Sequence, residues 1–109
     1  EVATTSAAVQ KGLSGRSALA RNHGMLFLFP LADRYRFWMP HMHFPIDIIW
    51  IADGKVVSIT ADASPQFDPA HPVFYTPSSP VRSVLEVNAG FAKEHGIGAG
   101  DAVFFNEIE

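Results

Sequence analysis

Two histidines and an aspartate lie close together in the sequence, at His41, His43 and Asp47. In an extended chain alternate side chains project to the same side, so these three residues would share one face. Two imidazoles and a carboxylate are a common ligand set for zinc and, as a facial triad, for iron. The spacing therefore suggests a divalent-metal site, and no other cofactor is indicated. Pro45 interrupts this segment and could turn Asp47 away from the histidines.

Asp47 is also unusual because it stands inside an apolar run, Ile46-Asp47-Ile48-Ile49-Trp50. An ionised carboxylate buried there would cost several kcal/mol unless it had a partner. The structural interpretation is an ion pair with Arg16 or a set of backbone N–H bonds. The functional interpretation is a catalytic or ligand-anchoring acid. Both interpretations predict that Asp47 is partnered.

Glu86 and Asn88 form a second polar pair, and they share one strand face by the same alternation. Glu86 is either a buried partner or a site acid. Asn88 suits the N-cap of a following helix, with a ligand-binding amide as the alternative. If Asp47 and Glu86 met in a cleft, they would form a paired-carboxylate site for general acid–base catalysis.

Aromatic side chains are concentrated in the segment 35–39 and at Trp50, and most of them are expected in the core. A ring exposed beside a cleft would instead stack on a sugar or a peptide. Trp38 and Tyr75 are the candidates, because the proline-rich segment 62–80 that carries Tyr75 could fold over a pocket.

The elements that must position these side chains follow from hydrophobic patterns and turn residues. Short helices are predicted over residues 4–13 and 91–95, and strands over residues 24–29, 35–39, 46–52, 55–61, 82–87 and 101–108. Asp53-Gly54 between two β-branched runs predicts a type I′ hairpin. Five of the eight prolines fall within residues 62–80, which excludes a central strand there.

Composition sets the class of protein. The chain has 109 residues, of which 48% are hydrophobic and 17% charged, with a net charge of −3 and no cysteine. These values favour one domain over residues 1–109 and exclude disulfides, cysteine-ligated metals and thiol catalysis. They leave no overall basic field for nucleic acid, and no apolar run reaches the length of a transmembrane segment. We predict a mainly-β fold: an antiparallel β-sandwich or a partly open barrel with two short helices.

Several short segments resemble one family in their order and spacing. They are Gly12-Leu13 with Arg16, Gly24-Met25-Leu26-Phe27, Phe37-Trp38-Met39, Pro45-Ile46-Asp47-Ile48-Ile49, Glu86-Val87-Asn88-Ala89-Gly90 and Gly100-Asp101. Together they resemble the bacterial and archaeal domain-of-unknown-function family 192, which implies a compact β-rich domain, often preceded by an export signal, with no established activity. Arg16 belongs to this pattern, so we expect it to be the partner of Asp47. His41 does not belong to it.

Two functions from different classes follow. The first is a binding or interaction domain that presents the corner 38–47 and the loop 62–80 to a small molecule, a peptide or a glycan. Its candidate ligand-binding residues are Arg16, Trp38, Asp47, Tyr75, Glu86 and Asn88. The second is a small enzyme, hydrolase-like or metal-assisted, that uses Asp47 and Glu86 as acids and His41 and His43 as metal ligands.

The chain is expected to be exported, in the periplasm or at the cell envelope, although a cytoplasmic location stays open. Because the sequence begins with Glu1 rather than Met, we expect a fragment or a processed form, with an export signal or a further strand before residue 1. The sequence does not indicate an oligomeric state.

Overall fold

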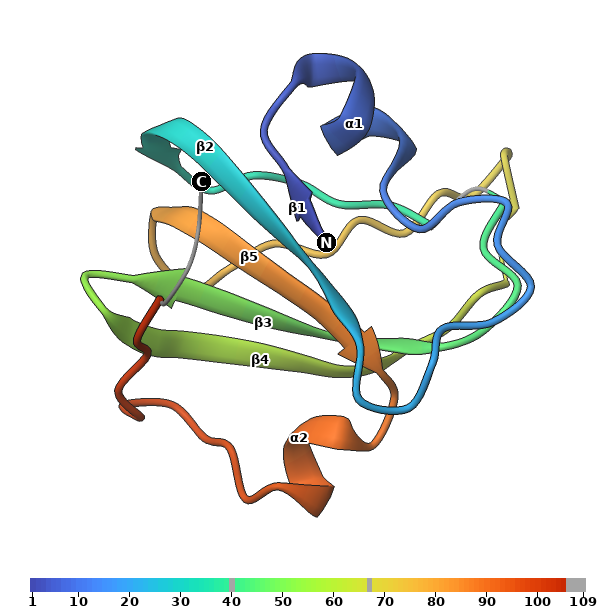
Figure 1. Cartoon of the computed structure of the whole chain (residues 1–109). Helices are drawn as coiled ribbons and strands as arrows, with labels where there is room; N and C mark the ends of the chain where they lie inside the picture. Colours follow the sequence, from blue (N-terminus) through green and yellow to red (C-terminus); the bar gives the residue numbers. More distant parts are fainter. Residues whose placement is uncertain (40, 67, 106–109) are drawn as a thin grey trace.

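Figure 1 shows the computed structural model of the chain, which describes residues 1–39, 41–66 and 68–105. Five strands form one sheet in the order β1-β2-β5-β3-β4. They are β1 (Val2–Ala3), β2 (Gly24–Asp33), β3 (Ile46–Ala52), β4 (Lys55–Ala63) and β5 (Val81–Asn88). Only β1 pairs in parallel, with β2, and the sheet is not closed into a barrel. The predicted mainly-β fold, a partly open sandwich with two short helices, is confirmed.

The two helices lie on opposite sides of the sheet (Figure 1). Helix α1 (Ser6–Lys11) begins after Thr5, whose Oγ1 accepts a hydrogen bond from the Ala8 N–H at 3.1 Å. Helix α2 (Phe91–Glu94) follows β5. Alternate residues of the strands face opposite sides of the sheet, so the buried side chains form two hydrophobic clusters. Each helix covers one of these clusters.

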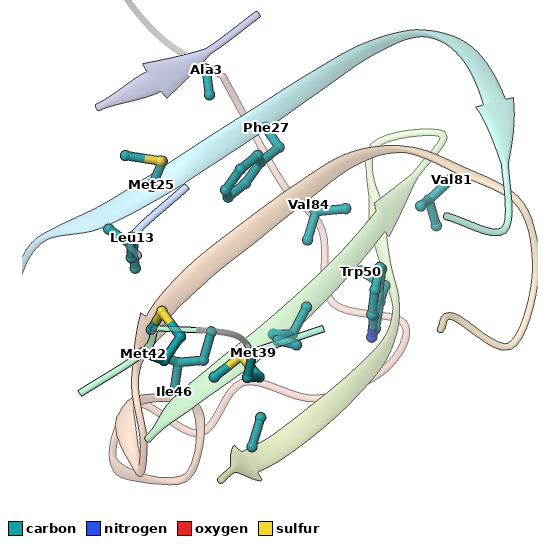
Figure 2. Close-up of a cluster of buried hydrophobic side chains, with 12 residues drawn as sticks. Ala3, Leu13, Met25, Phe27, Met39, Met42, Ile46, Trp50, Val81 and Val84 are labelled. Atoms are coloured by element: carbon teal, nitrogen blue, oxygen red, sulfur yellow. The ribbon is translucent and has the colours of Figure 1, made fainter. Parts of the chain in front are cut away.

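The larger cluster lies on the α1 side. Figure 2 shows Leu13 and Met25 toward the β2 side of this cluster, and Met39 and Met42 close to Ile46 at the start of β3. The smaller cluster, on the α2 side, is built around Ile49, Ile51, Val56 and Val87.

The β3–β4 hairpin forms as the sequence predicts. Asp53 has φ = +52° and Gly54 has φ = +72°, so both central residues adopt the left-handed conformation that a type I′ turn requires. The hairpin prediction is confirmed.

Two other predicted strands are wrong within the described residues. In the segment 35–39 only Phe37 forms a bridge, with Tyr75, and the prolines near Tyr75 lack the N–H groups that would extend a ladder. In the segment 101–105 only Ala102 forms a bridge, with Lys55. The backbone hydrogen bonds from that segment to the hairpin reach only Gly54 in the turn and Val56 at the start of β4. The rest of the predicted strand, from residue 106, lies outside the described residues.

The carboxylate of Asp47 connects three elements. Its side chain is 1% exposed; its Oδ1 accepts a hydrogen bond from the Asp62 N–H at 2.9 Å, and its Oδ2 accepts one from the Ala92 N–H at 3.0 Å. Asp62 lies near the end of β4 with φ = +54°, and Ala92 lies in the first turn of α2. Asp47 therefore holds both elements to β3 through backbone bonds. The expected pairing with Arg16 is wrong, because the Arg16 guanidinium is held by Glu1, with Nη2 donating to Oε1 at 2.8 Å.

We expect Asp47→Ala to lower the free energy of unfolding by about 3 kcal/mol, because two amides lose a charged acceptor in a buried site. Urea unfolding followed by tryptophan fluorescence measures the change. Asp33→Ala is the matched control: it removes an exposed carboxylate that accepts a bond from the Arg34 N–H, and should cost below about 1 kcal/mol. Equal losses in the two variants would contradict a structural role for Asp47.

Candidate functional site

The two buried acids of the sheet lie on opposite faces. In the β3–β5 pairing Asp47 is opposite Val87, and Glu86 is opposite Ile48. Residues directly opposite each other project to the same side, and successive residues project to opposite sides. Asp47 therefore faces the α2 side and Glu86 faces the α1 side. They do not form a paired-carboxylate site.

A cavity of about 200 Å³ opens on the α1 side, between the end of α1, β2, β5, the segment 36–39 and Met42. Its apolar walls are formed by Val9, Leu13, Phe27, Phe37, Met39 and Met42. Polar side chains that line it include Lys11, Ser14 and Arg36. Glu86 is the single acidic residue among the described residues that line the cavity.

Glu86 is 6% exposed, and its neighbours across the two adjacent strands are the apolar residues Met25 and Ile48. Burial raises the pKa of the Glu86 carboxyl to about 8. No hydrogen bond or opposite charge from the described residues offsets this effect. The carboxyl is therefore mainly protonated near neutral pH, and it can both donate and accept a hydrogen bond.

Gly12 brings the end of α1 close to this carboxyl. It ends α1 with φ = +48°, a conformation that favours glycine. A Cβ at this position would lie 3.2 Å from Cζ of Phe27 and 3.8 Å from Oε1 of Glu86. Glycine at position 12 thus lets the backbone at the end of α1 pack directly against the Phe27 ring and the Glu86 carboxyl.

The wall of the cavity at the segment 36–39 is held by the proline-rich loop. Phe37 and Tyr75 exchange two backbone hydrogen bonds, of 2.8 and 2.7 Å. The Trp38 ring, 52% exposed, stacks on Phe74 with centroids 5.7 Å apart, and the Arg36 guanidinium lies 4.6 Å from the centre of the Phe74 ring. Phe74 and Tyr75 of the proline-rich loop therefore support this wall of the cavity.

Of the residues singled out in the sequence, Trp38 and Glu86 line the cavity. Tyr75 packs half-buried against the core, and its neighbour Phe74 is the ring that contacts Trp38. Arg16 is paired with Glu1.

Asn88 holds a loop instead of a helix end. Its Nδ2 donates to the carbonyl oxygen of Leu19 at 2.8 Å, and the N-cap of α2 is Gly90, without a side-chain bond. The capping prediction for Asn88 is wrong, because Asp47 supplies the acceptor for the first turn of α2 from another strand.

The two histidines do not join Asp47. His41 has φ = +61°, which breaks the extended alternation on which a shared face depends, and both His41 and His43 are exposed while Asp47 is buried. Within residues 1–39, 41–66 and 68–105, no three His, Cys, Asp or Glu side chains are grouped so that they could hold a metal ion.

Several lining residues were not among the predicted site residues. Gly12, Leu13, Phe27, Phe37 and Met39 belong to segments that carry the family resemblance, and that shared membership is the signal that could have brought them together. Nothing in the sequence marked Met42.

An open mixed sheet, two short helices and a small cavity beside one buried glutamate define a small β-rich domain. The chain belongs to the family described as DUF192, an uncharacterized ACR, which matches residues 1–105. The predicted family is confirmed.

Two solved structures are similar to the chain over nearly its whole length. A protein of unknown function from Novosphingobium aromaticivorans DSM 12444 is 38% identical, with a TM-score of 0.87, over 96% of this chain and 73% of that chain. A candidate transcription regulator from Sinorhizobium meliloti 1021 is 34% identical, with a TM-score of 0.85, over 94% of this chain and 77% of that chain. The search of curated proteins found no match. None of the helices in the described residues is long and apolar enough to cross a membrane.

Glu86 should make stability depend on pH. Its folded-state pKa of about 8 lies above the ordinary value of 4.5, so the folded state holds the proton more tightly and stability falls as pH rises between these values. Glu86→Gln keeps the shape and removes the titration. We expect wild type to lose a few kcal/mol of unfolding free energy relative to this variant between about pH 5 and pH 8.

Urea unfolding at a series of pH values measures this difference. Glu94→Gln, which removes an exposed carboxyl, is the control and should run parallel to wild type over the same range. If Glu86→Gln also runs parallel to wild type, the carboxyl does not titrate as its burial requires.

Proposed function

We propose that this domain is a binding module that holds a small amphipathic molecule in the cavity beside Glu86. The observation that carries the proposal is Glu86, a residue that is 6% exposed and lines the cavity, and whose carboxyl has no hydrogen bond or opposite charge among the described residues. A buried polar group without partners destabilises a fold by about 1–3 kcal/mol. A ligand that supplies the missing hydrogen bonds would offset that cost.

The cavity size indicates the size of the ligand. At about 200 Å³ it is smaller than the roughly 300–1,000 Å³ usual for drug-sized ligands. It therefore suits a small metabolite or one end group of a longer molecule. This favours a small molecule over the peptide and glycan alternatives.

The alternative function, a small enzyme, required Asp47 and Glu86 in one site, but the two side chains face opposite sides of the sheet. The described lining residues include no second carboxylate and no histidine to act with Glu86. A net charge of −3 gives no overall attraction to phosphates.

A blocked cavity tests the proposal. Val9 lines the cavity from α1, so Val9→Trp should fill it, whereas Leu31→Trp introduces the same ring at a residue that is 73% exposed. The immobilised proteins are incubated with the small-molecule fraction of a bacterial culture, washed and eluted for mass spectrometry. We expect at least one compound enriched more than about tenfold on wild type and Leu31→Trp relative to Val9→Trp. No such enrichment, with all three proteins folded by circular dichroism, would refute binding at this cavity.

We further propose that the domain acts outside the cytoplasm, in the periplasm or at the cell envelope. One feature supports this: the family resemblance implies a domain that is often preceded by an export signal. The absence of cysteine is compatible with either compartment. Immunoblots of periplasmic and cytoplasmic fractions of its own bacterium, with a marker enzyme for each, test the location. We expect the protein with the periplasmic marker; recovery with the cytoplasmic marker alone would contradict export.

A further inference from the structure

We infer that the buried end of the ligand is an uncharged group that both donates and accepts hydrogen bonds, most simply a primary carboxamide, set against Glu86. The rest of the ligand would be an apolar or aromatic body between Leu13, Phe27 and Phe37. This inference rests on the proposed function and adds the chemical class of the ligand.

The charges around the cavity disfavour a cationic ligand. Lys11 and Arg36 are among the lining residues and carry the same sign as an ammonium or amidinium group. Neither of them contributes to the state of the Glu86 carboxyl, which is governed by burial. A cation would therefore have to ionise Glu86 and bury both charges in an apolar site, which is costly.

An anionic end group is also a poor match. The buried apolar residues that line the cavity include Leu13, Phe27 and Met39, whose side chains offer no hydrogen-bond donors. A carboxylate would receive one bond, from the protonated carboxyl, and would lose its hydration. Lys11 and Arg36 favour a negative charge only toward the exposed side, where both residues lie.

A primary carboxamide matches both oxygens of a protonated carboxyl. The Glu86 O–H donates to the amide oxygen, while the other Glu86 oxygen accepts from the amide N–H. The cavity that Glu86 lines gives such a planar group access to the carboxyl. An aromatic body would lie against Phe27 and Phe37, whose rings meet edge to face with centroids 5.4 Å apart.

Three probes of equal shape separate these possibilities: benzamide, benzamidine and benzoate carry a neutral, a positive and a negative end on the same ring. The protein is labelled with ¹³C at its methionine methyl groups and titrated with each probe near pH 6. Met39 and Met42 line the cavity and report occupancy. We expect benzamide to shift both methyl signals with a Kd of about 1–10 mM, and the charged probes to bind at least about tenfold more weakly.

Variants of Glu86 test whether the carboxyl makes the contact. Glu86→Gln keeps a donor and an acceptor and should bind benzamide within a few fold of wild type. Glu86→Leu removes both and should weaken binding about tenfold. Val9→Trp should show no shift with any probe, which would place the signals in the cavity.

The outcomes distinguish this inference from the proposed function. Tightest binding of benzamidine, lost in Glu86→Gln, would overturn the ligand class while a cavity that binds small molecules would stand. Equal affinity of benzamide for wild type and Glu86→Leu would likewise overturn it. If none of the probes shifts Met39 or Met42 at about 20 mM, the inference fails, and the enrichment experiment with Val9→Trp then decides the proposed function by itself.

Discussion

The antiparallel register between β3 and β5 is the constraint on which both buried acids depend. It sets Asp47 opposite Val87 and Glu86 opposite Ile48, and thereby sends two neighbouring carboxyls to opposite faces of the sheet. On the α2 face Asp47 meets two backbone N–H groups. On the α1 face Glu86 meets apolar side chains and a cavity. One strand pairing thus gives similar side chains a structural role and a candidate binding role.

The two acids differ in how their burial is compensated. Asp47 connects β3 with the end of β4 and the start of α2, so the hydrogen bonds that satisfy it also stabilise the sheet edge and a helix of four residues. Such a short helix has little stability of its own, and an acceptor from a neighbouring strand replaces the missing side-chain cap. Glu86 makes no comparable connection, and its raised pKa is the sign of burial without compensation. Buried ionisable groups without compensating partners lower stability, and in natural folds they occur mainly at functional sites.

Local patterns predicted the elements well, because hairpin turns and helix ends depend on neighbouring residues. Asp53-Gly54 specified its turn through two positive φ angles, and Thr5 capped α1. The prediction failed where strand pairing or a hydrogen bond depends on a partner that is distant in the sequence. The segment 35–39 has strand-like residues, yet its neighbour in the structure is a proline-rich loop that allows only one bridge. The partners of Asp47 and Asn88 lie 15 to 69 residues away, beyond what spacing reveals.

The site was predictable only in part for the same reason. Spacing marked Glu86 and Trp38 as single residues, but the cavity needs Gly12, Phe27 and Phe37 beside them, and only the folded sheet brings these together. The prediction that His41 and His43 share one face with Asp47 failed because of one backbone angle, the positive φ of His41. No pattern in that segment signals this angle. The positive φ at Gly12 ends α1 where its backbone meets Phe27 and the Glu86 carboxyl, and a glycine there fits this close approach. The chemistry of the site thus follows from one acid that the sheet register buries and from the cavity that this acid lines.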